Sequence, residues 1–463
     1  MFKTFKNAWN TPELKTKLLF TLLVIMVYRL GCSIMVPWVS ADAMSYFEAS
    51  YGGSIFGFMN LLSGGAFSTA TLFALGVSPY ITSSIVIQLL TIVIPKLEQW
   101  SKEGEEGRKK ISALTRAVTI ALAVITSVGY ALLAISNNMT VLCSTADNKT
   151  YYWANGATTQ GFGIGAVFAN AGFQFIVMVL CFCAGASIVM WIAEKVNDHG
   201  IGNGISIILF AGIISSLPTG VVGFIQKIYD GNKFNPWWIL WCVVILAIVL
   251  AAVFFIIWFT NSERRIPVQY AKRVVGRKMY GGQSSNLPLQ LNMAGVMPVI
   301  FANAIVTIPG TIAQFAIGGK SEGFWQSVIN IFANTKPLYI VLFIILLVAF
   351  AYFYIMISFN PVEVANNIKN NGGAIPGIRP GKPTKDYIQK TLNRITFIGA
   401  LFLCTISALP MIVNAICVAC GQYSFQTLAL SGTSVLIVVG VVLETEREIE
   451  AQLTMRNYKG FLD

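Results

Sequence analysis

The sequence predicts an all-α polytopic membrane protein, and three observations support this fold class. The chain of 463 residues is 55% hydrophobic and 11% charged, with a mean hydropathy of +0.68, whereas soluble proteins carry about 25% charged residues. Apolar runs close to the ~20 residues that cross a bilayer recur along the chain. Basic residues also alternate between successive loops, as membrane topology requires. The chain is therefore predicted to span a membrane many times.

Ten apolar runs are long enough to be predicted as transmembrane helices. The fifth run is the least regular, because Gly202, Gly204, Gly212 and Pro218 interrupt it. The ten runs lie at residues 17–36, 73–94, 113–135, 172–192, 203–219, 238–259, 294–316, 337–358, 394–413 and 429–446.

The distribution of Lys and Arg orients these helices. If the N-terminus is cytoplasmic, the loops on that side hold 26 Lys and Arg and the opposite loops hold 5, and Arg29 inside the first run completes the total of 32. The positive-inside rule therefore predicts a multi-pass protein of the cytoplasmic membrane with both termini in the cytoplasm. The first run follows a polar head and lacks a small-residue cleavage pattern, so we expect no cleavable signal peptide.

Residues 61–90 are apolar enough for a membrane but begin with small and polar side chains. Ser63, Gly64 and Gly65 open the stretch, Pro79 follows, and only residues 73–94 are long enough to cross a bilayer. A broken half-helix leaves backbone groups without partners, which is tolerated only where it packs in protein or lines a watery cavity. The stretch therefore indicates a pathway through the protein.

Two predicted cytoplasmic loops, at residues 261–290 and 359–393, are more basic than orientation alone requires. Topology is one explanation, and a membrane surface, an acidic protein or the phosphates of RNA would also suit them. Their basic residues are Arg264, Arg265, Lys272, Arg273, Arg277 and Lys278 in the first loop, and Lys369, Arg379, Lys382, Lys385 and Lys390 in the second.

The sequence contains no recognisable catalytic, metal or cofactor site. Its single histidine, His199, cannot build a metal cluster or a histidine-based triad. In GIRPGKPT the Walker spacing fails, because Pro376 stands where the first glycine belongs. The helix interiors hold almost no Asp or Glu, which ion-coupled transporters place near the midplane. We therefore expect no metal, no cofactor and no enzymatic activity, and any energy must come from a partner.

Two further features remain open at this point. Arg29, at about two-thirds of the first run, is expected to reach the interface or to meet backbone carbonyls in a structural role. Cys417 and Cys420 lie outside the predicted spans, where they either form a disulfide or only pack.

Five stretches in a fixed order carry a family resemblance. They are GEEGRKKISALTR (104–116), IVMWIAEKVNDHGIGNGISIILFAGI (188–213), RRIPVQYAKRVVGRKMYGGQSSNLPLQLNMAGVMPVIFA (264–302), FNPVEVANNIKNNGGAIPGIRPGKPT (359–384) and SGTSVLIVV (431–439). Together with ten spans, they closely resemble the SecY/Sec61-alpha family, the central subunits of Sec protein-conducting channels. The resemblance covers residues 17 to 446 and implies translocation of unfolded preproteins and lateral release of apolar segments into lipid.

The resemblance implies two five-helix halves around a central pore, at residues 1–219 and 220–463. The broken front of the second span, residues 55–69, would be a re-entrant plug half-helix that fills the closed channel. Glycine suits an element that must leave and return, because it is poorly committed to a helix. The plug residues implied are Asn60, Ser63, Gly64 and Gly65.

Two sets of residues would control the path of the substrate in such a channel. A ring of aliphatic side chains at the waist excludes ions by dewetting; by resemblance it consists of Val77, Ile81, Leu209, Ile300 and Ile437. A lateral gate between the second and seventh spans would use Thr82, Ser83, Gln88 and Asn292. Ordinary helix packing explains these polar residues equally well.

The resemblance also implies partners. The membrane subunits SecE and SecG would lie beside the channel, with SecE bracing its halves, and signal peptides, preproteins and lipid would meet it inside the membrane. The motor ATPase SecA or the ribosome would dock on the basic loops, through Arg265, Arg277, Lys278 and Arg379.

Two other classes of function compete with the channel. A secondary transporter of a small solute also uses broken helices, but it predicts a polar or ionisable site at the midplane. A scaffold that only recruits cytoplasmic partners would explain the basic loops and leave the broken helix without a purpose.

Overall fold

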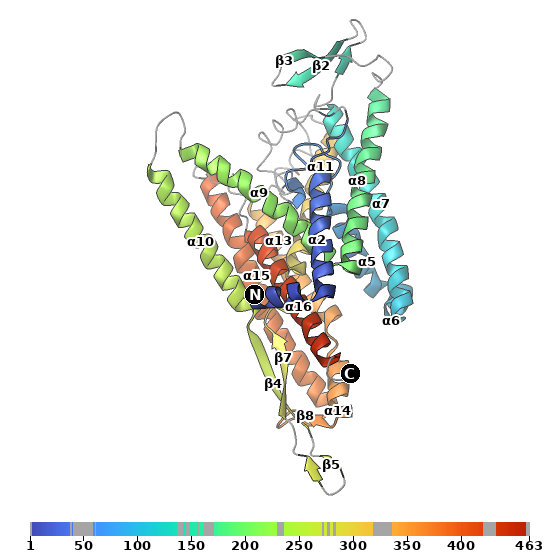
Figure 1. Cartoon of the computed structure of the whole chain (residues 1–463), viewed down its shortest axis with the longest axis vertical. Coiled ribbons are helices and arrows are strands. Elements are labelled where there is room, and N and C mark those ends of the chain that lie inside the picture. Colours follow the sequence, from blue (N-terminus) through green and yellow to red (C-terminus); the bar gives the residue numbers. More distant parts are fainter. Residues whose placement is uncertain are drawn as a thin grey trace.

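The computed structural model of the chain describes most of its residues. The described residues are 2–37, 39, 59–60, 62–136, 142–144, 149–154, 157–161, 171–228, 236–270, 273–275, 278–280, 284–317, 336–419 and 432–459. In this part of the chain, helices run along the long axis of an elongated molecule, and two small sheets lie toward its opposite ends (Figure 1).

Ten long helices in the described part of the chain occupy the ten predicted spans. They are α2 (Pro12–Gly31), α5 (Ser78–Val93), α7 (Glu105–Ser136), α8 (Ala171–His199), α9 (Gly204–Ile228), α10 (Pro236–Thr260), α11 (Met297–Ile317), α13 (Pro337–Ser358), α15 (Lys382–Ala419) and α16 (Gly432–Lys459). The shorter helices are α1 (Phe2–Asn10), α6 (Pro95–Lys102) and α14 (Pro361–Asn370).

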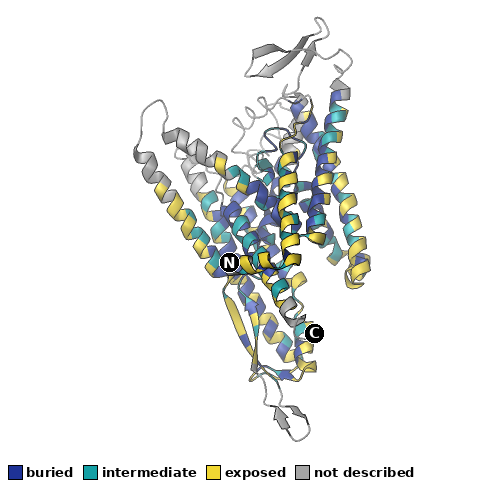
Figure 2. Cartoon of the chain, viewed as in Figure 1, coloured by how far each residue is buried: buried dark blue, intermediate teal, exposed yellow. Residues whose placement is uncertain are grey.

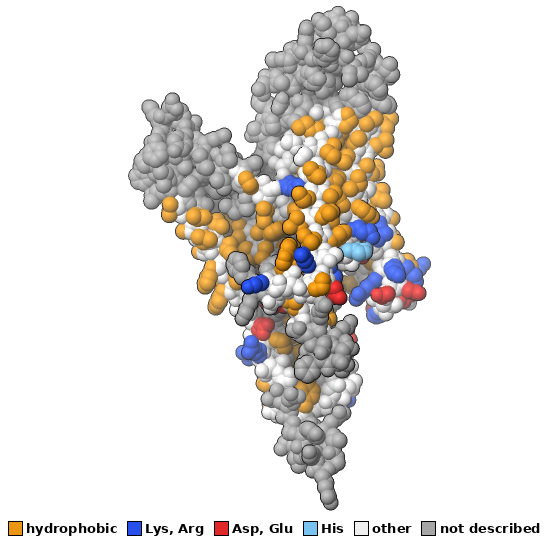
Figure 3. All heavy atoms as spheres, viewed as in Figure 1, with side chains coloured by type: hydrophobic (Ala, Val, Ile, Leu, Met, Phe, Trp, Pro, Cys, Tyr) orange, Lys and Arg blue, Asp and Glu red, His pale blue; other side chains and the backbone are white. Residues whose placement is uncertain are grey.

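The described helices have the composition of a membrane protein. By length and apolarity alone, four of them can cross a membrane, and the pair α5 and α6, bent by 101° at its break, makes a fifth. Hydrophobic side chains cover the middle of the molecule, and charged side chains gather mainly below them (Figure 3). Exposed Leu22, Leu23 and Met26 on α2 belong to this apolar surface, which suits lipid rather than water.

The first five and the last five of these helices each form a connected set, which we call the first and the second helix group, and the two groups also pack against each other. In the first group α2 packs on α8 and α9, α5 on α7, α7 on α8, and α8 on α9. In the second, α10 packs on α16, α11 on α13, α13 on α15, and α15 on α16. Between the groups, α11 meets α5 and α7, while α9 meets α10 and α16. The buried side chains lie along these contacts (Figure 2).

The second predicted span begins later than expected, at Ser78 instead of residue 73. Left-handed backbone at Gly64 (φ 66°), Gly65 (φ 89°), Ala70 (φ 47°) and Gly76 (φ 53°) prevents a continuous helix before it. Pro79 then lies in the first turn of α5, where its missing N–H costs nothing. Residues 64–77 therefore form turns, apart from a β-bridge between Thr71 and Met35.

The basic loops are folded, although they were predicted only as loops. Strands β4 (Glu263–Tyr270) and β7 (Ser284–Gln290) pair antiparallel, and β8 (Gly373–Ala374) extends the sheet in the order β7-β4-β8. Ile266 and Val268 of β4 pack against Ile388 and Leu392 of α15. In the same loop, β5 (Arg273–Val275) and β6 (Lys278–Tyr280) pair with each other. A separate sheet consists of β1 (Leu142–Ser144), β2 (Lys149–Ala154) and β3 (Ala157–Gly161).

Gly31 at the end of α2 allows the ring of Phe73 to lie directly on the helix. A Cβ at residue 31 would fall 1.9 Å from Phe73 Cε2. The same ring stacks on Tyr28, with centroids 5.8 Å apart. The turn segment before α5 is thus packed against α2 at Gly31.

We predict that Gly31→Ala destabilises the folded protein by about 1–3 kcal/mol, because the added methyl overpacks this contact. The measurement is the thermal unfolding midpoint in detergent. Phe73→Leu in the same chain should recover part of the loss, and Leu30→Ala, on an exposed side chain of the same helix, is the control. An unchanged midpoint for Gly31→Ala would contradict this packing.

Candidate functional site

The five predicted waist residues lie in the centre of the helical core. Each is at most 7% exposed, and all five belong to one hydrophobic cluster. They come from both helix groups: Val77 and Ile81 at the start of α5, Leu209 on α9, Ile300 on α11 and Ile437 on α16. Ile81, Ile300 and Ile437 line a single cavity of about 210 Å³.

This cavity, which we call the seam cavity, lies where α11 meets α5 and α7. Its walls are mostly aliphatic, and Met59 and Leu62 also reach it. Its further lining includes Leu122, Ile125 and Thr126 of α7 and Ala304, Thr307, Ile308 and Ile312 of α11. A cavity of this composition favours apolar side chains, because it offers few hydrogen-bond partners.

The predicted lateral-gate residues do not all lie at this seam. Thr82 lines the seam cavity, and its hydroxyl donates to the Ser78 carbonyl at 3.0 Å. Gln88 is half-buried and donates to Ser84 Oγ at 3.4 Å within its own helix. Ser83 donates to the Thr115 carbonyl of α7 at 2.8 Å, in the contact between α5 and α7. Successive helical residues point about 100° apart, so Ser83 is removed from the predicted seam.

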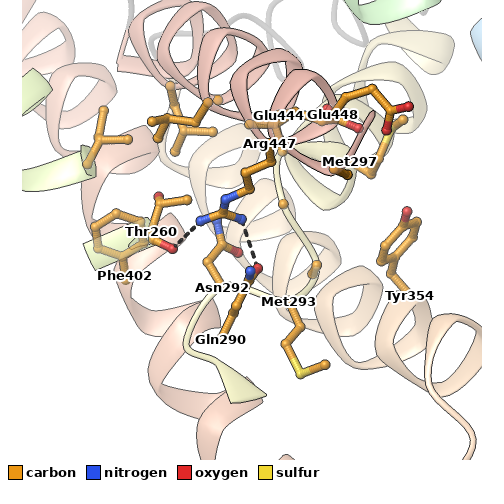
Figure 4. A pocket seen from close by; sticks show the side chains of 18 residues that line it. Thr260, Gln290, Asn292, Met293, Met297, Tyr354, Phe402, Glu444, Arg447 and Glu448 are labelled. Atoms are coloured by element: carbon orange, nitrogen blue, oxygen red, sulfur yellow. Dashed lines mark hydrogen bonds between the residues drawn. The ribbon is translucent and has the colours of Figure 1, made fainter. Parts of the chain in front are cut away.

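Asn292 lines a second cavity of about 390 Å³ bordered by α10, α11, α13, α15 and α16 (Figure 4). Arg447 of α16 crosses this cavity and donates to Gln290 Oε1 and to the Thr260 carbonyl, each at 2.8 Å. Asn292 is 7% exposed, and its Oδ1 has no hydrogen-bond partner among the described residues. Asn292 thus precedes α11 and lines this second cavity, and it is not among the residues that line the seam cavity.

The predicted plug residues form a compact turn. Asn60 Oδ1 accepts from the Ser68 N–H at 3.0 Å, and the Asn60 carbonyl accepts from the Gly65 N–H at 2.9 Å. Ser63 Oγ accepts from the Phe67 N–H at 3.0 Å. Asn60 and Ser63 thus satisfy backbone donors that a broken helix leaves without partners. Residues 55–58 and 61 of the predicted plug lie outside the described residues.

The C-terminal end of the predicted plug segment packs into the helical core. Phe67 is 3% exposed, and its carbonyl accepts a 2.8 Å hydrogen bond from the Tyr130 hydroxyl of α7. Its ring meets that of Tyr130 edge to face, with centroids 4.8 Å apart, and Tyr130 in turn meets Phe182 of α8. The segment from Ala66 onward therefore belongs to the packed core, and Gly64 and Gly65 separate it from the residues before them.

The described residues of the predicted docking set belong to the sheet of β4, β7 and β8 or to segments that follow its strands. The side chain of Arg265 on β4 is 71% exposed, 3.7 Å from Glu263. Arg379 is exposed in the turn between β8 and α15, which Gly377 (φ 80°) and Gly381 (φ 104°) shape. Thr384 Oγ1 donates to the Arg379 carbonyl at 2.9 Å and holds this turn. Lys278 belongs to β6, and Arg277 lies outside the described residues.

Within the described ranges, no group of three or more His, Cys, Asp or Glu side chains is placed to hold a metal ion. Cys420, one member of the possible disulfide, lies outside those ranges.

Comparison with known proteins agrees with this arrangement. The SecY family model matches residues 71–446. The protein translocase subunit SecY of Streptomyces galbus is 43% identical over 466 residues, covering 100% of both chains.

Two solved structures share the fold. One concerns the plug domain of a SecY protein, which stabilises the closed state of that translocation channel and maintains a membrane seal. It has a TM-score of 0.61 at 18% identity and covers 94% of this chain and 92% of its own. The other is Sec61 in the canine ribosome-channel complex from the endoplasmic reticulum. Its TM-score is 0.61 at 17% identity, with the same coverage.

Proposed function

This chain belongs to the SecY family and is a protein-conducting channel of the membrane. We propose which of its residues form the pore constriction, the lateral exit, the plug and the docking surface. The observation that carries the proposal is the aliphatic waist: Ile81, Ile300 and Ile437, from three helices of two groups, surround one cavity. A secondary transporter would need a polar or ionisable site at this position, and the comparisons give that alternative no support.

The waist closes the channel to ions without selecting any one polypeptide. Val77, Ile81, Leu209, Ile300 and Ile437 form its ring. An aliphatic constriction dewets when it is empty, so hydrated ions do not enter. The same side chains can close around a passing chain through dispersion contacts, which are individually weak and indifferent to sequence. Such a gate suits unfolded preproteins of many sequences.

The seam cavity is the lateral exit. Apolar segments, such as the ~7–15-residue h-region of a signal peptide, gain free energy by leaving water for lipid. The walls of α5, α7 and α11 give them an apolar surface where α11 meets the first helix group. Thr82 lies at this exit, and Gln88 lies two turns further along α5.

The two helix groups are the two halves of the channel, and the division between them falls after α9, which ends at Ile228, nine residues beyond the predicted boundary at residue 219. Residues 60–65, with Asn60, Ser63, Gly64 and Gly65, are the plug that fills the pore on its outer side when the channel is closed. Both termini and the sheet of β4, β7 and β8 face the cytoplasm. The positive-inside distribution supports this orientation, and so does the hydrogen bond from Arg447 of α16 to Gln290 of β7, which joins the last described helix to that sheet.

The basic cytoplasmic surface docks partners that supply the energy, since the channel itself catalyses no reaction. Arg265, Arg277, Lys278 and Arg379 are its contact residues for SecA or for the ribosome. The family membership and the canine Sec61–ribosome complex support this assignment. Arginine is suited to it because its guanidinium binds phosphates and carboxylates in two-point contacts. SecE and SecG complete the membrane complex.

Translocation into vesicles tests the proposal directly. The channel, purified with its co-purifying small membrane subunits, is reconstituted and supplied with SecA, ATP and a labelled preprotein. We expect the preprotein to become protected from external protease in an ATP-dependent way. Vesicles that accumulate a small solute and never protect the preprotein would instead support a transporter.

We predict that Ile300→Asn opens the waist to water, because an amide at the constriction removes its dewetting. The expected result is a resting ion conductance at least about tenfold above wild type, with export of preproteins that carry defective signal peptides. Ile305→Asn, on the same helix but outside the lining of the seam cavity, is the matched control. Wild-type conductance together with wild-type signal selectivity would exclude Ile300 from the ring.

We predict that Arg379→Glu lowers SecA-driven export by roughly tenfold or more, since reversing a charge within a docking contact costs several kcal/mol. Assembly with the small membrane subunits should remain normal, because the side chain is exposed. Lys390→Glu makes the corresponding charge change at an exposed residue of the neighbouring helix α15 and should have a smaller effect. Unchanged export by Arg379→Glu would remove this residue from the docking surface.

A further inference from the structure

Arg29 is a charged residue within a helix that is otherwise apolar along its exposed face. Its neighbours Leu22, Leu23, Met26 and Leu30 are each more than half exposed on α2. Placing an arginine inside a membrane segment costs free energy, so the group that the guanidinium contacts indicates the role of the residue. That partner is the plug segment: Arg29 Nη1 donates to the Gly64 carbonyl at 3.4 Å, across 35 positions of sequence.

The same carbonyl is approached from a second helix. Ser215 Oγ of α9 lies 3.4 Å from the Gly64 oxygen and 2.6 Å from the Gly212 carbonyl. A Cβ at residue 64 would fall 2.5 Å from Ser215 Oγ and 2.9 Å from Arg29 Nη1. A Cβ on Gly212 would fall 2.4 Å from the Leu62 carbonyl. The plug backbone is therefore held between α2 and α9, and only glycine fits at residue 64.

The charge of Arg29 has little other compensation in the described part of the chain. Its Nη2 atom is buried without a hydrogen-bond partner, and no described carboxylate lies within 4.0 Å of the guanidinium. Cys32, one turn along α2, places its Sγ 4.0 Å from the Ser63 carbonyl and so faces the same segment. If the plug left this site, the charge-assisted contact between Arg29 and the Gly64 carbonyl would be lost. The guanidinium of Arg29 would then face an open pore.

We propose that Arg29 is the latch that holds the plug in the closed channel, and that this latch sets how strongly a signal peptide must bind before the channel opens. The proposal rests on the proposed function of residues 60–65 as the plug. The latch acts through the position of the plug backbone. Arg29 is thus a positioning residue for closure and a determinant of signal selectivity.

Replacement of the guanidinium tests the latch in the complete channel complex. Losing one hydrogen bond to a charged group changes an equilibrium by about tenfold or more. We therefore expect Arg29→Gln to raise the resting ion conductance of planar bilayers about tenfold and to permit export of preproteins with defective signal peptides. Arg29→Lys keeps the charge and should lie between Arg29→Gln and wild type. Leu30→Gln adds the same amide to the exposed side of α2 and should stay sealed.

A cross-link separates loss of the latch from general misfolding. In the double variant Arg29→Gln, Ser63→Cys, a thiol oxidant can join the new cysteine to Cys32, which already faces residue 63. If the leak arises because the plug leaves, oxidation should return the conductance to the wild-type level and reduction should restore the leak. Adding Cys32→Ser should abolish this response.

Two outcomes would overturn the latch: wild-type conductance and selectivity in Arg29→Gln, or a leak that the Cys32 cross-link leaves unchanged. Both are distinguishable from failure of the proposed function. If wild-type vesicles do not protect a preprotein, the channel assignment fails, whereas protection together with a sealed Arg29→Gln channel removes the latch alone.

Discussion

The structure depends on one constraint, which is that the backbone from Leu62 to Val77 lies inside the helical assembly without forming a continuous helix. Its N–H and C=O groups need partners that helical backbone would have provided internally. Helices α2 and α7, and the residues that follow α2, supply them. The Leu72 N–H donates to the Ile34 carbonyl, Tyr130 of α7 donates to the Phe67 carbonyl, and Arg29 of α2 donates to the Gly64 carbonyl. The segment thereby ties the first helix group together.

The proposed waist and the proposed lateral exit both depend on the same interruption. Because α5 begins only at Ser78, Val77 and Ile81 stand at its first turn in the middle of the core, beside Ile300 and Ile437. The glycines at 64 and 65 then divide the segment into an anchored part and a part held by few contacts. A plug that must open and reseal a channel needs both parts. One part stays attached to the helices, and the contacts of the other part are weak enough to break.

The sequence predicts the ten helices well because apolar length and loop charge are properties of the chain alone. It does not predict which face of a helix a residue occupies, such as the contact of Ser83 with α7. Nor does it predict how a loop folds back, which places Asn292 in the second cavity. The basic loops were predicted from charge, but their strands depend on packing against α15. Arg29 is recognisable in the sequence as a charged residue inside an apolar run. Its contact with Gly64 depends on tertiary structure.

Site-specific photo-crosslinking to a preprotein stalled during translocation tests the central claim most directly, namely that the chain passes through the aliphatic waist. A photoreactive amino acid is placed in turn at Ile81, Ile300 and Ile437, and at Ile345, which is 59% exposed on α13. The account predicts strong adducts from the three waist positions and none from Ile345. Equal yields at all four positions, or adducts from Ile345 alone, would contradict it.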